Sequence, residues 1–317
     1  MLKDFIVRIR LSINIKHRVN LSLGILDTWG EKMKLAHKEA VEGYVFALPS
    51  ITGFIVFFAT PFVVSLYYCF TKGIGGTSFV GLENFIELLN SNSFRLAAKN
   101  TLKFNAVSVP LIIILSLAFA ILLNGNLKYV SNFRTFFIFP LVIPTASVIL
   151  VWQILFNDYG IINNFLSSFG VQNVEWLNSK WIFYILVLLY IWKNCGYDIV
   201  LFIAGINTIP KEYYESAEID GANKFTCFIY ITLPSLIPMG FFVFIISIIN
   251  SFKVFREAYL LAGSYPHFDL YMLQHFMNNN FINLNYQRLS TASFLVVIII
   301  VILTSILFKF ESKYGKN

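Results

Sequence analysis

The composition of this 317-residue chain excludes most classes of soluble protein. It is 57% hydrophobic and only 13% charged, and it contains 34 phenylalanines, whereas a soluble domain carries about twice that share of charge. The net charge of +7 would suit a nucleic-acid partner. However, the basic residues gather in the first forty positions and in short loops, which is the distribution of a membrane protein. We therefore expect an all-α integral membrane protein and no nucleic-acid partner.

The first 43 residues form a basic tail. No apolar core of signal-peptide length follows its first charges, so we expect no cleavage. Two interpretations stay open: an amphipathic helix resting on anionic membrane lipid, or a disordered lead-in that only fixes orientation. The basic residues of the tail are Lys3, Arg8, Arg10, Lys16, Arg18, Lys32, Lys34 and Lys38.

Six apolar segments follow, each close to the length of about 20 residues that a helix needs to cross a bilayer. Together they define one transmembrane domain, residues 44–310, which a short tail, residues 311–317, follows. An even number of spans places both termini on one side, and the basic tail assigns that side to the cytoplasm. The predicted spans are residues 44–70, 100–123, 136–156, 181–206, 235–251 and 292–310.

Prolines inside two of these spans predict bends. Pro49 and Pro61 lie in the first span, which we expect to be kinked, and Pro140 and Pro144 lie in the third. In a helix bundle, neighbouring groups can satisfy the carbonyls that a proline leaves unpaired. Such bends either line a cavity or reflect packing geometry alone.

The fourth span carries polar groups at membrane depth. Each charge costs about 2.5–3.5 kcal/mol there, so Lys193 and Asp198 need partners or water. They are five residues apart and are expected to face different sides of the helix. Either these groups line a translocation path, or Lys193 is structural, through snorkelling or an ion pair with another span. The candidate pathway residues are Tyr190, Trp192, Asn194, Tyr197, Asp198 and Asn250.

A polar stretch, residues 207–234, separates the fourth and fifth spans. Pro210 suits the first position of a helix, and Gly221 suits a left-handed stop. The helix between them would be about 16 Å long, too short to cross a bilayer, so it must lie outside the membrane. Tyr213, Tyr214, Ala217 and Ala222 would give it one contact face. The candidate docking residues are Glu212, Tyr213, Tyr214, Glu215, Ala217, Asp220, Gly221, Ala222, Leu233 and Pro234.

The spacing within this stretch resembles the EAA loop of permease subunits in binding-protein-dependent ABC importers. The matching positions are Glu215-Ser216-Ala217, Gly221 and Ile231-Thr232-Leu233-Pro234, with Ser216 where the family usually has alanine. Residues 209–215 and 219–222 resemble the sugar-importing branch, as does Phe79-Val80-Gly81-Leu82-Glu83-Asn84-Phe85. The two prolines of the third span, followed by Trp152, fit the same family. The resemblance covers essentially the whole chain from Tyr44 onward.

This resemblance implies a six-helix ABC importer transmembrane domain with a cytoplasmic coupling helix. The expected partners are a second, related permease subunit (a heterodimer), a dimeric ABC ATPase and an extracytoplasmic sugar-binding protein. The chain itself would not be an enzyme and would need no cofactor, because the ATPase binds ATP and Mg²⁺. Consistent with this, it has no G-x-x-x-x-G-K-[ST] phosphate loop. The expected location is a bacterial plasma membrane.

Two other classes compete with the importer. An ion-coupled secondary transporter would show inverted repeats, and we find no convincing repeat. An intramembrane enzyme would need a nucleophile or metal ligands, but only isolated candidates exist. His267 and His275 suggest either a metal site or an exposed loop, and we expect the loop. The identity of the sugar stays open. We interpret the three cysteines, Cys69, Cys195 and Cys227, as packing residues.

Overall fold

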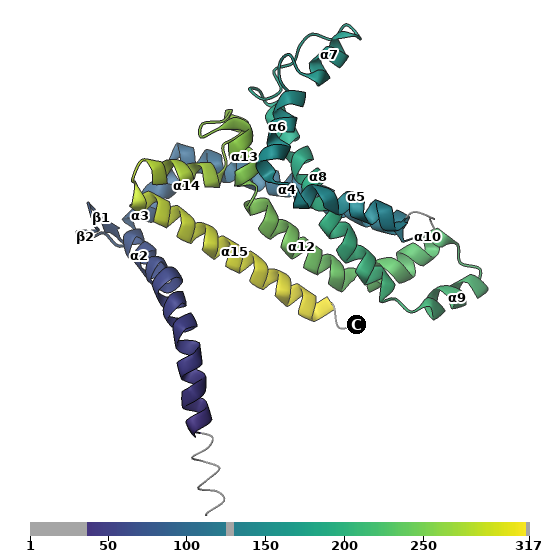
Figure 1. Cartoon of the computed structure of the whole chain (residues 1–317), viewed down its shortest axis with the longest axis horizontal. Coiled ribbons are helices and arrows are strands. Elements are labelled where there is room, and N and C mark those ends of the chain that lie inside the picture. Colours follow the sequence, from purple (N-terminus) through teal and green to yellow (C-terminus); the bar gives the residue numbers. More distant parts are fainter. Residues whose placement is uncertain (1–36, 125–129, 315–317) are drawn as a thin grey trace, which may run out of the picture. The chain divides into compact units, whose positions relative to one another are not determined.

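A computed structural model describes residues 37–124 and 130–314 of the chain, which is largely helical. The chain divides into two compact units, residues 1–64 and residues 65–317. Two predictions fall outside the described residues. These are the two interpretations of the basic tail over residues 1–36 and the end of the C-terminal tail at residues 315–317. Figure 1 shows the elements of each unit.

Each of the six predicted spans corresponds to helix in the described part of the chain. Five helices are long and apolar enough to cross a membrane, and a bent pair makes a sixth if it counts as one span. The sequence prediction of six apolar segments is therefore confirmed, although most of the helices begin earlier or end later than predicted. The five single helices are His37–Cys69, Asn92–Leu123 (α4), Trp181–Asn207 (α8), Ile237–Ala262 and Tyr286–Leu307.

Two π-helical turns lie just before prolines in the helices. The first span runs through Pro49 without interruption, and its π-helix, η1 (Ile55–Ala59), lies just before α2 (Thr60–Cys69) and Pro61. A second, η2 (Phe228–Thr232), lies just before Pro234. Proline lacks an N–H and its ring crowds the carbonyl four residues earlier, so a wider turn relieves the strain. The expected kink in the first span takes the form of this wide turn.

The third span is broken rather than continuous. Helices α5 (Val130–Val142) and α6 (Thr145–Leu155) meet at an angle of 106°, with the break at Pro144. Pro140 stays inside α5. The expected bend is confirmed, but a single straight span over residues 136–156 is wrong, because Pro144 adopts an extended backbone that a helix cannot continue through. Helix α7 (Ile161–Ser167) follows α6 in the next loop (Figure 1).

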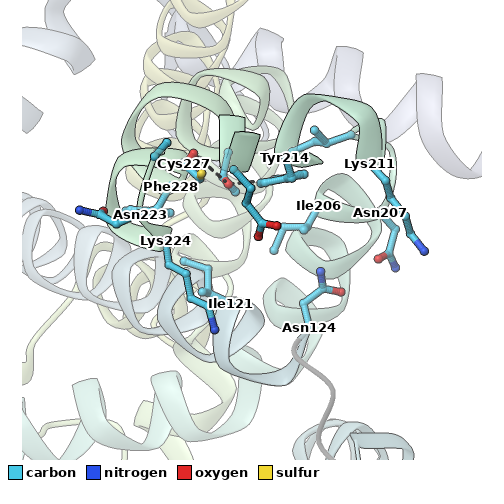
Figure 2. A pocket seen from close by; sticks show the side chains of 14 residues that line it. Ile121, Asn124, Ile206, Asn207, Lys211, Tyr214, Asn223, Lys224, Cys227 and Phe228 are labelled. Atoms are coloured by element: carbon cyan, nitrogen blue, oxygen red, sulfur yellow. Dashed lines mark hydrogen bonds between the residues drawn. The ribbon is translucent and has the colours of Figure 1, made fainter. Parts of the chain in front are cut away.

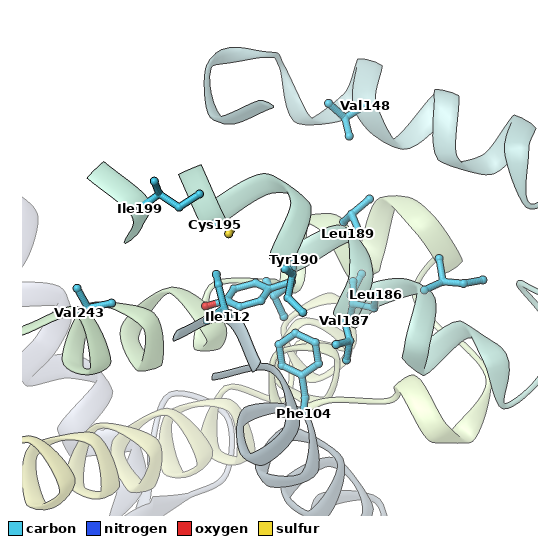
Figure 3. Packing of buried hydrophobic residues seen from close by; sticks show 14 of the residues in the cluster. Phe104, Ile112, Val148, Leu186, Val187, Leu189, Tyr190, Cys195, Ile199 and Val243 are labelled. Carbon is cyan, nitrogen blue, oxygen red and sulfur yellow. The ribbon is translucent and has the colours of Figure 1, made fainter. Parts of the chain in front are cut away.

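Helix α8 forms the centre of the second unit. It packs against α4, α5 and α12 (Ile237–Phe252). Its Tyr190 ring lies against Phe104 of α4, and Leu186 belongs to the same buried cluster (Figure 3). A Cβ added at Gly196 would lie 1.8 Å from the carbonyl oxygen of Phe137 in α5. The two backbones can approach this closely because glycine has no side chain.

Residues 252–289 are more ordered than the sequence predicted. The predicted fifth span ends at residue 251, and we expected an exposed loop around His267 and His275. Instead, α12 is followed in the same candidate span by α13 (Phe255–Ala262), and then by the short helix η3 (Phe268–Leu270) and α14 (Leu273–Ile282). Helix α15 (Tyr286–Tyr314) completes the chain. The loop prediction failed because these elements are amphipathic and bury one face against α4, α6 and α15.

A small hairpin and a short helix lie near the start of the second unit. Strands β1 (Thr71–Lys72) and β2 (Ser78–Phe79) pair antiparallel, and α3 (Glu83–Asn90) follows them. The Lys72 ammonium contacts carboxylate oxygens of Glu83 at 2.8 Å and Glu87 at 2.5 Å. These charge pairs lie between the hairpin and α3, and they are exposed to water.

His275 is fully buried in α14, so its assignment to an exposed loop is wrong. Its Nδ1 accepts a hydrogen bond from the Met272 N–H at 3.3 Å, while Nε2 has no partner. No group of three metal-binding side chains occurs among the described residues. All three cysteines are buried and free, which confirms their interpretation as packing residues.

Burial lowers the pKa of His275 to about 4, below the value of about 6.5 in an unfolded chain. The folded state therefore excludes a proton that the unfolded state binds. The contribution of His275 to the free energy of unfolding is fully present above pH 6.5. It is lost as the pH falls towards 4, and the loss is at most about 3 kcal/mol. We expect His275→Gln to flatten this pH dependence of the unfolding midpoint. Identical pH profiles for wild type and His275→Gln would contradict this account.

Candidate functional site

The predicted docking helix exists as α9 (Lys211–Ile219), between Pro210 as its N-cap and Asp220 as its C-cap. Glu212 lies in its first turn, near the positive end of the helix dipole. The helix is nine residues long, far short of a membrane span. It lies beyond the end of α8 (Figure 1), as the sequence predicted for a segment outside the bilayer.

Gly221 ends this helix in the left-handed conformation, with φ of +84°. The Ala222 N–H donates to the Ala217 carbonyl at 2.9 Å, and the Gly221 N–H donates to the Glu218 carbonyl at 3.1 Å. These bonds satisfy carbonyls that the helix end leaves free. A Cβ at Gly221 would meet no atom of the described residues within 4 Å, so the requirement for glycine comes from the backbone conformation and not from crowding among those residues.

The structure divides the predicted contact face of α9 in two. Tyr214, Ala217 and Ala222 turn towards the rest of the chain and are half-buried. Tyr213 is 58% exposed and Ile219 is 87% exposed. The remaining predicted docking residues of this helix are also exposed: Glu212, Glu215, Asp220 and Gly221. The outward face is therefore acidic with two large apolar side chains, and sequence reasoning missed Ile219.

A hydrogen bond fastens the inner face of α9 to the segment that returns to the membrane. The hydroxyls of Tyr214 and Thr232 lie 2.8 Å apart. After α9, Asn223 caps α10 (Lys224–Cys227) by accepting from the Thr226 N–H at 2.8 Å. The predicted docking residues Leu233 and Pro234 follow in α11 (Leu233–Ser235) and are exposed.

Lys193 finds its partners on two other helices. Its ammonium forms an ion pair with Glu257 of α13 and donates to the Thr145 hydroxyl of α6 at 2.8 Å. The Lys193 and Glu257 side chains are 13% and 12% exposed. The ion pair explains how both charges are held near membrane depth, as the structural interpretation of Lys193 predicted. Thr145 begins α6 just after the break, so its hydrogen bond with Lys193 also links α8 to the bent span.

Asp198 belongs to a different set of contacts. It is 2% exposed and accepts a hydrogen bond from the Ser247 hydroxyl of α12 at 3.0 Å. The Tyr190 hydroxyl donates to the Ser247 carbonyl at 2.8 Å. At 100° per residue, Lys193 and Asp198 lie about 140° apart around the helix, so they face different neighbours as predicted.

A cavity of 90 Å³ brings together three of the six predicted pathway residues, Tyr190, Asn194 and Asn250, with Lys193 and Glu257. It has room for a few water molecules. The Asn194 amide donates to the Tyr190 carbonyl at 2.8 Å. The other three predicted residues lie elsewhere. Asp198 is buried beside Ser247, while Trp192 and Tyr197 are exposed on the surface of this chain.

Sequence reasoning missed Glu257, Thr145 and Ser247. Glu257 was missed because it lies beyond residue 251, where the predicted fifth span ends, although a lone carboxylate close to a membrane span is itself a signal for a buried cation. Thr145 directly follows the proline of the broken span. Ser247 lies in the apolar run of the fifth span, where only its polar side chain could have indicated a partner for Asp198.

These features together describe a membrane protein of the permease class, with a short helix outside the spans and polar groups within them. Comparison with known proteins then gives the family. Residues 47–312 match the family of binding-protein-dependent transport system inner membrane components. The chain belongs to this family.

Similar proteins agree with this assignment. The trehalose/maltose transport system permease protein MalF of Thermococcus litoralis is 36% identical over 74% of this chain and 81% of its own length. The arabinooligosaccharides transport system permease protein AraP of Bacillus subtilis is 34% identical over 72% of this chain and 74% of its own length. A crystal structure of a bacterial ABC transporter that imports alginate contains a chain of the same fold, with a TM-score of 0.79 and 23% identity over 88% of this chain and 98% of that one.

The Lys193–Glu257 pair can be tested by a double-mutant cycle. Lys193→Met leaves the Glu257 carboxylate buried without a counter-ion, which should destabilise the protein by about 3–5 kcal/mol. The double variant Lys193→Met/Glu257→Met should recover most of that loss, because no uncompensated charge remains. The measurement is the unfolding midpoint of the purified protein in detergent.

The exposed ion pair between Lys72 and Glu83 supplies the matched control. Lys72→Met and Lys72→Met/Glu83→Met should both unfold close to wild type, since water screens an exposed pair. A double variant at positions 193 and 257 that is as unstable as Lys193→Met alone would contradict the role of this pair.

Proposed function

We propose that this chain is one of two permease subunits of an ATP-driven importer that carries a sugar into the cell. The outward face of α9, ending at the left-handed Gly221, is the observation that carries the proposal. A short acidic helix with exposed Tyr213 and Ile219 has the chemistry of a docking surface for another protein. The sugar follows from the relatives, whose names specify trehalose, maltose and arabinooligosaccharides.

The energy for transport comes from a partner. The sequence has no phosphate-binding loop of the G-x-x-x-x-G-K-[ST] type, so in this proposal a dimeric ATPase binds ATP and Mg²⁺ and receives α9 in a cleft. Closure of the ATPase dimer carries α9 as a lever, and the spans shift from an inward-open to an outward-open state. The Tyr214–Thr232 hydrogen bond passes this movement to the return segment.

The remaining assignments follow from the same proposal. Both termini lie in the cytoplasm of a bacterial cell, a second, related permease completes the pathway, and a sugar-binding protein delivers the substrate from outside. Tyr190, Asn194 and Asn250, which share the 90 Å³ cavity, are the pathway residues that the geometry favours. Their amide and hydroxyl groups can hydrogen-bond sugar hydroxyls once the cavity widens.

Gly221→Asp tests the coupling loop. We expect the variant to insert in the membrane at the wild-type level but to lose sugar uptake, because an aspartate strains the left-handed turn by about 1–3 kcal/mol and adds charge to the docking face. The measurement is uptake of labelled trehalose, maltose and arabinooligosaccharides by cells, with membrane insertion followed by immunoblot.

Gly170→Asp is the matched control. Gly170 has φ of +76° and, like Gly221, open space around an added Cβ, but it lies in the loop between α7 and α8. Uptake should survive this substitution. Normal uptake by Gly221→Asp, or equal loss in both variants, would contradict a specific coupling role for α9.

The energy source separates this proposal from an ion-coupled transporter. In membrane vesicles, ATP supplied on the cytoplasmic side should support sugar uptake when ionophores have collapsed the proton and sodium gradients. An imposed ion gradient without ATP should support none. Uptake that follows the gradient and ignores ATP would establish the secondary transporter instead.

A further inference from the structure

A second feature of α9 lies on its inner face. A cavity of 720 Å³ lies between the inner face of this helix and the ends of α4 and α8 (Figure 2). Positions 211, 214, 218 and 222 line it, and their spacing of three and four residues places them on one face of the helix. Neither Tyr213 nor Ile219 lines the cavity, so the residues that line it are distinct from the exposed apolar pair of the docking face.

The position of the cavity fixes its depth relative to a bilayer. Ile121 and Ile206 line it, and they lie at the ends of two candidate membrane spans, Asn92–Leu123 and Trp181–Asn207. Apolar spans end where the hydrocarbon core gives way to lipid headgroups. The apolar part of the cavity therefore continues from the hydrocarbon region, and its polar part lies at headgroup level.

The charged groups of the cavity are two lysines and one carboxylate. Lys211 and Lys224 both line the cavity and lie on opposite sides of the view in Figure 2, and Glu218 lines the same space. In the described part of the chain, none of the three forms an ion pair. This pattern suits a ligand that carries both an anionic and a cationic group, each of which would gain a charge-assisted hydrogen bond.

We propose that this cavity binds one phospholipid with a primary-amine headgroup, of the phosphatidylethanolamine class. Lys211 and Lys224 contact the phosphate, and Glu218 accepts hydrogen bonds from the ammonium group. An acyl chain lies along Ile121 and Ile206. Phosphatidylcholine has no N–H to donate to Glu218, and phosphatidylglycerol has no cation to offer it. The inference depends on the spans crossing a bilayer and does not depend on which solute is transported.

Native mass spectrometry of the purified complex in a non-ionic detergent tests this site. The probe is an equimolar mixture of phosphatidylethanolamine, phosphatidylglycerol and phosphatidylcholine with the same acyl chains. We expect wild type to retain one phosphatidylethanolamine at roughly tenfold preference over the other two. Glu218→Gln should lose the preference over phosphatidylglycerol, and Lys211→Gln/Lys224→Gln should lose the bound lipid altogether.

Two further variants separate the site from general lipid adhesion. Ile121→Trp fills the apolar part of the cavity without changing its charge and should expel the lipid. Lys309→Gln removes a lysine that does not line the cavity and should behave as wild type. Unfolding midpoints of all variants show whether each remains folded, and lipid retention is read without any assay of transport.

Several results would overturn the proposal. Equal retention of the three lipids by wild type, or unchanged retention in the double lysine variant, would show that the charges do not select the headgroup. Glycerophosphoethanolamine has the same headgroup without acyl chains. If it displaces the lipid at equal concentration, the site recognises a soluble ligand and not a membrane lipid.

Discussion

The second unit depends on how helix α8 satisfies polar groups within an apolar span. Lys193 pairs with Glu257 of α13 and Thr145 of α6, whereas Asp198 accepts from Ser247 of α12. Since an unpaired charge at this depth is costly, each contact fixes a neighbouring helix at a defined rotation. The backbones of α8 and α5 also approach closely at Gly196, and this steric fit fixes the position of α5 against α8. Helix α8 thereby positions the polar cavity that Tyr190, Lys193 and Asn194 line.

Helix α9 extends this framework beyond the spans and presents two different surfaces. Its outward face carries Tyr213 and Ile219 and suits a protein partner, while its inward face lines a cavity at the ends of α4 and α8. The bond from Tyr214 to Thr232 joins both faces to the chain that re-enters the membrane. Helix α9 is therefore fastened to the segment that leads into the fifth span.

The sequence predicted the spans, α9 and its stop at Gly221, because apolar length, helix capping and left-handed glycine are local signals. It did not predict the 106° break at Pro144, since a proline indicates a bend and not its angle. Glu257 was missed because its partner is distant in sequence. The exposure of Ile219 and the inward turn of Tyr214 depend on how α9 packs, which periodicity over nine residues does not determine.

The most direct test of the central claim asks what touches the outward face of α9. A tagged chain with Ile219→Cys is treated with a short thiol-to-amine cross-linker in native membranes, and the product is purified and assayed for ATP hydrolysis. Ala222→Cys, on the inner face, is the control. The account predicts a cross-linked ATPase subunit for position 219 and none for position 222. A product without an ATPase, or equal cross-linking from both positions, would contradict the docking role of α9.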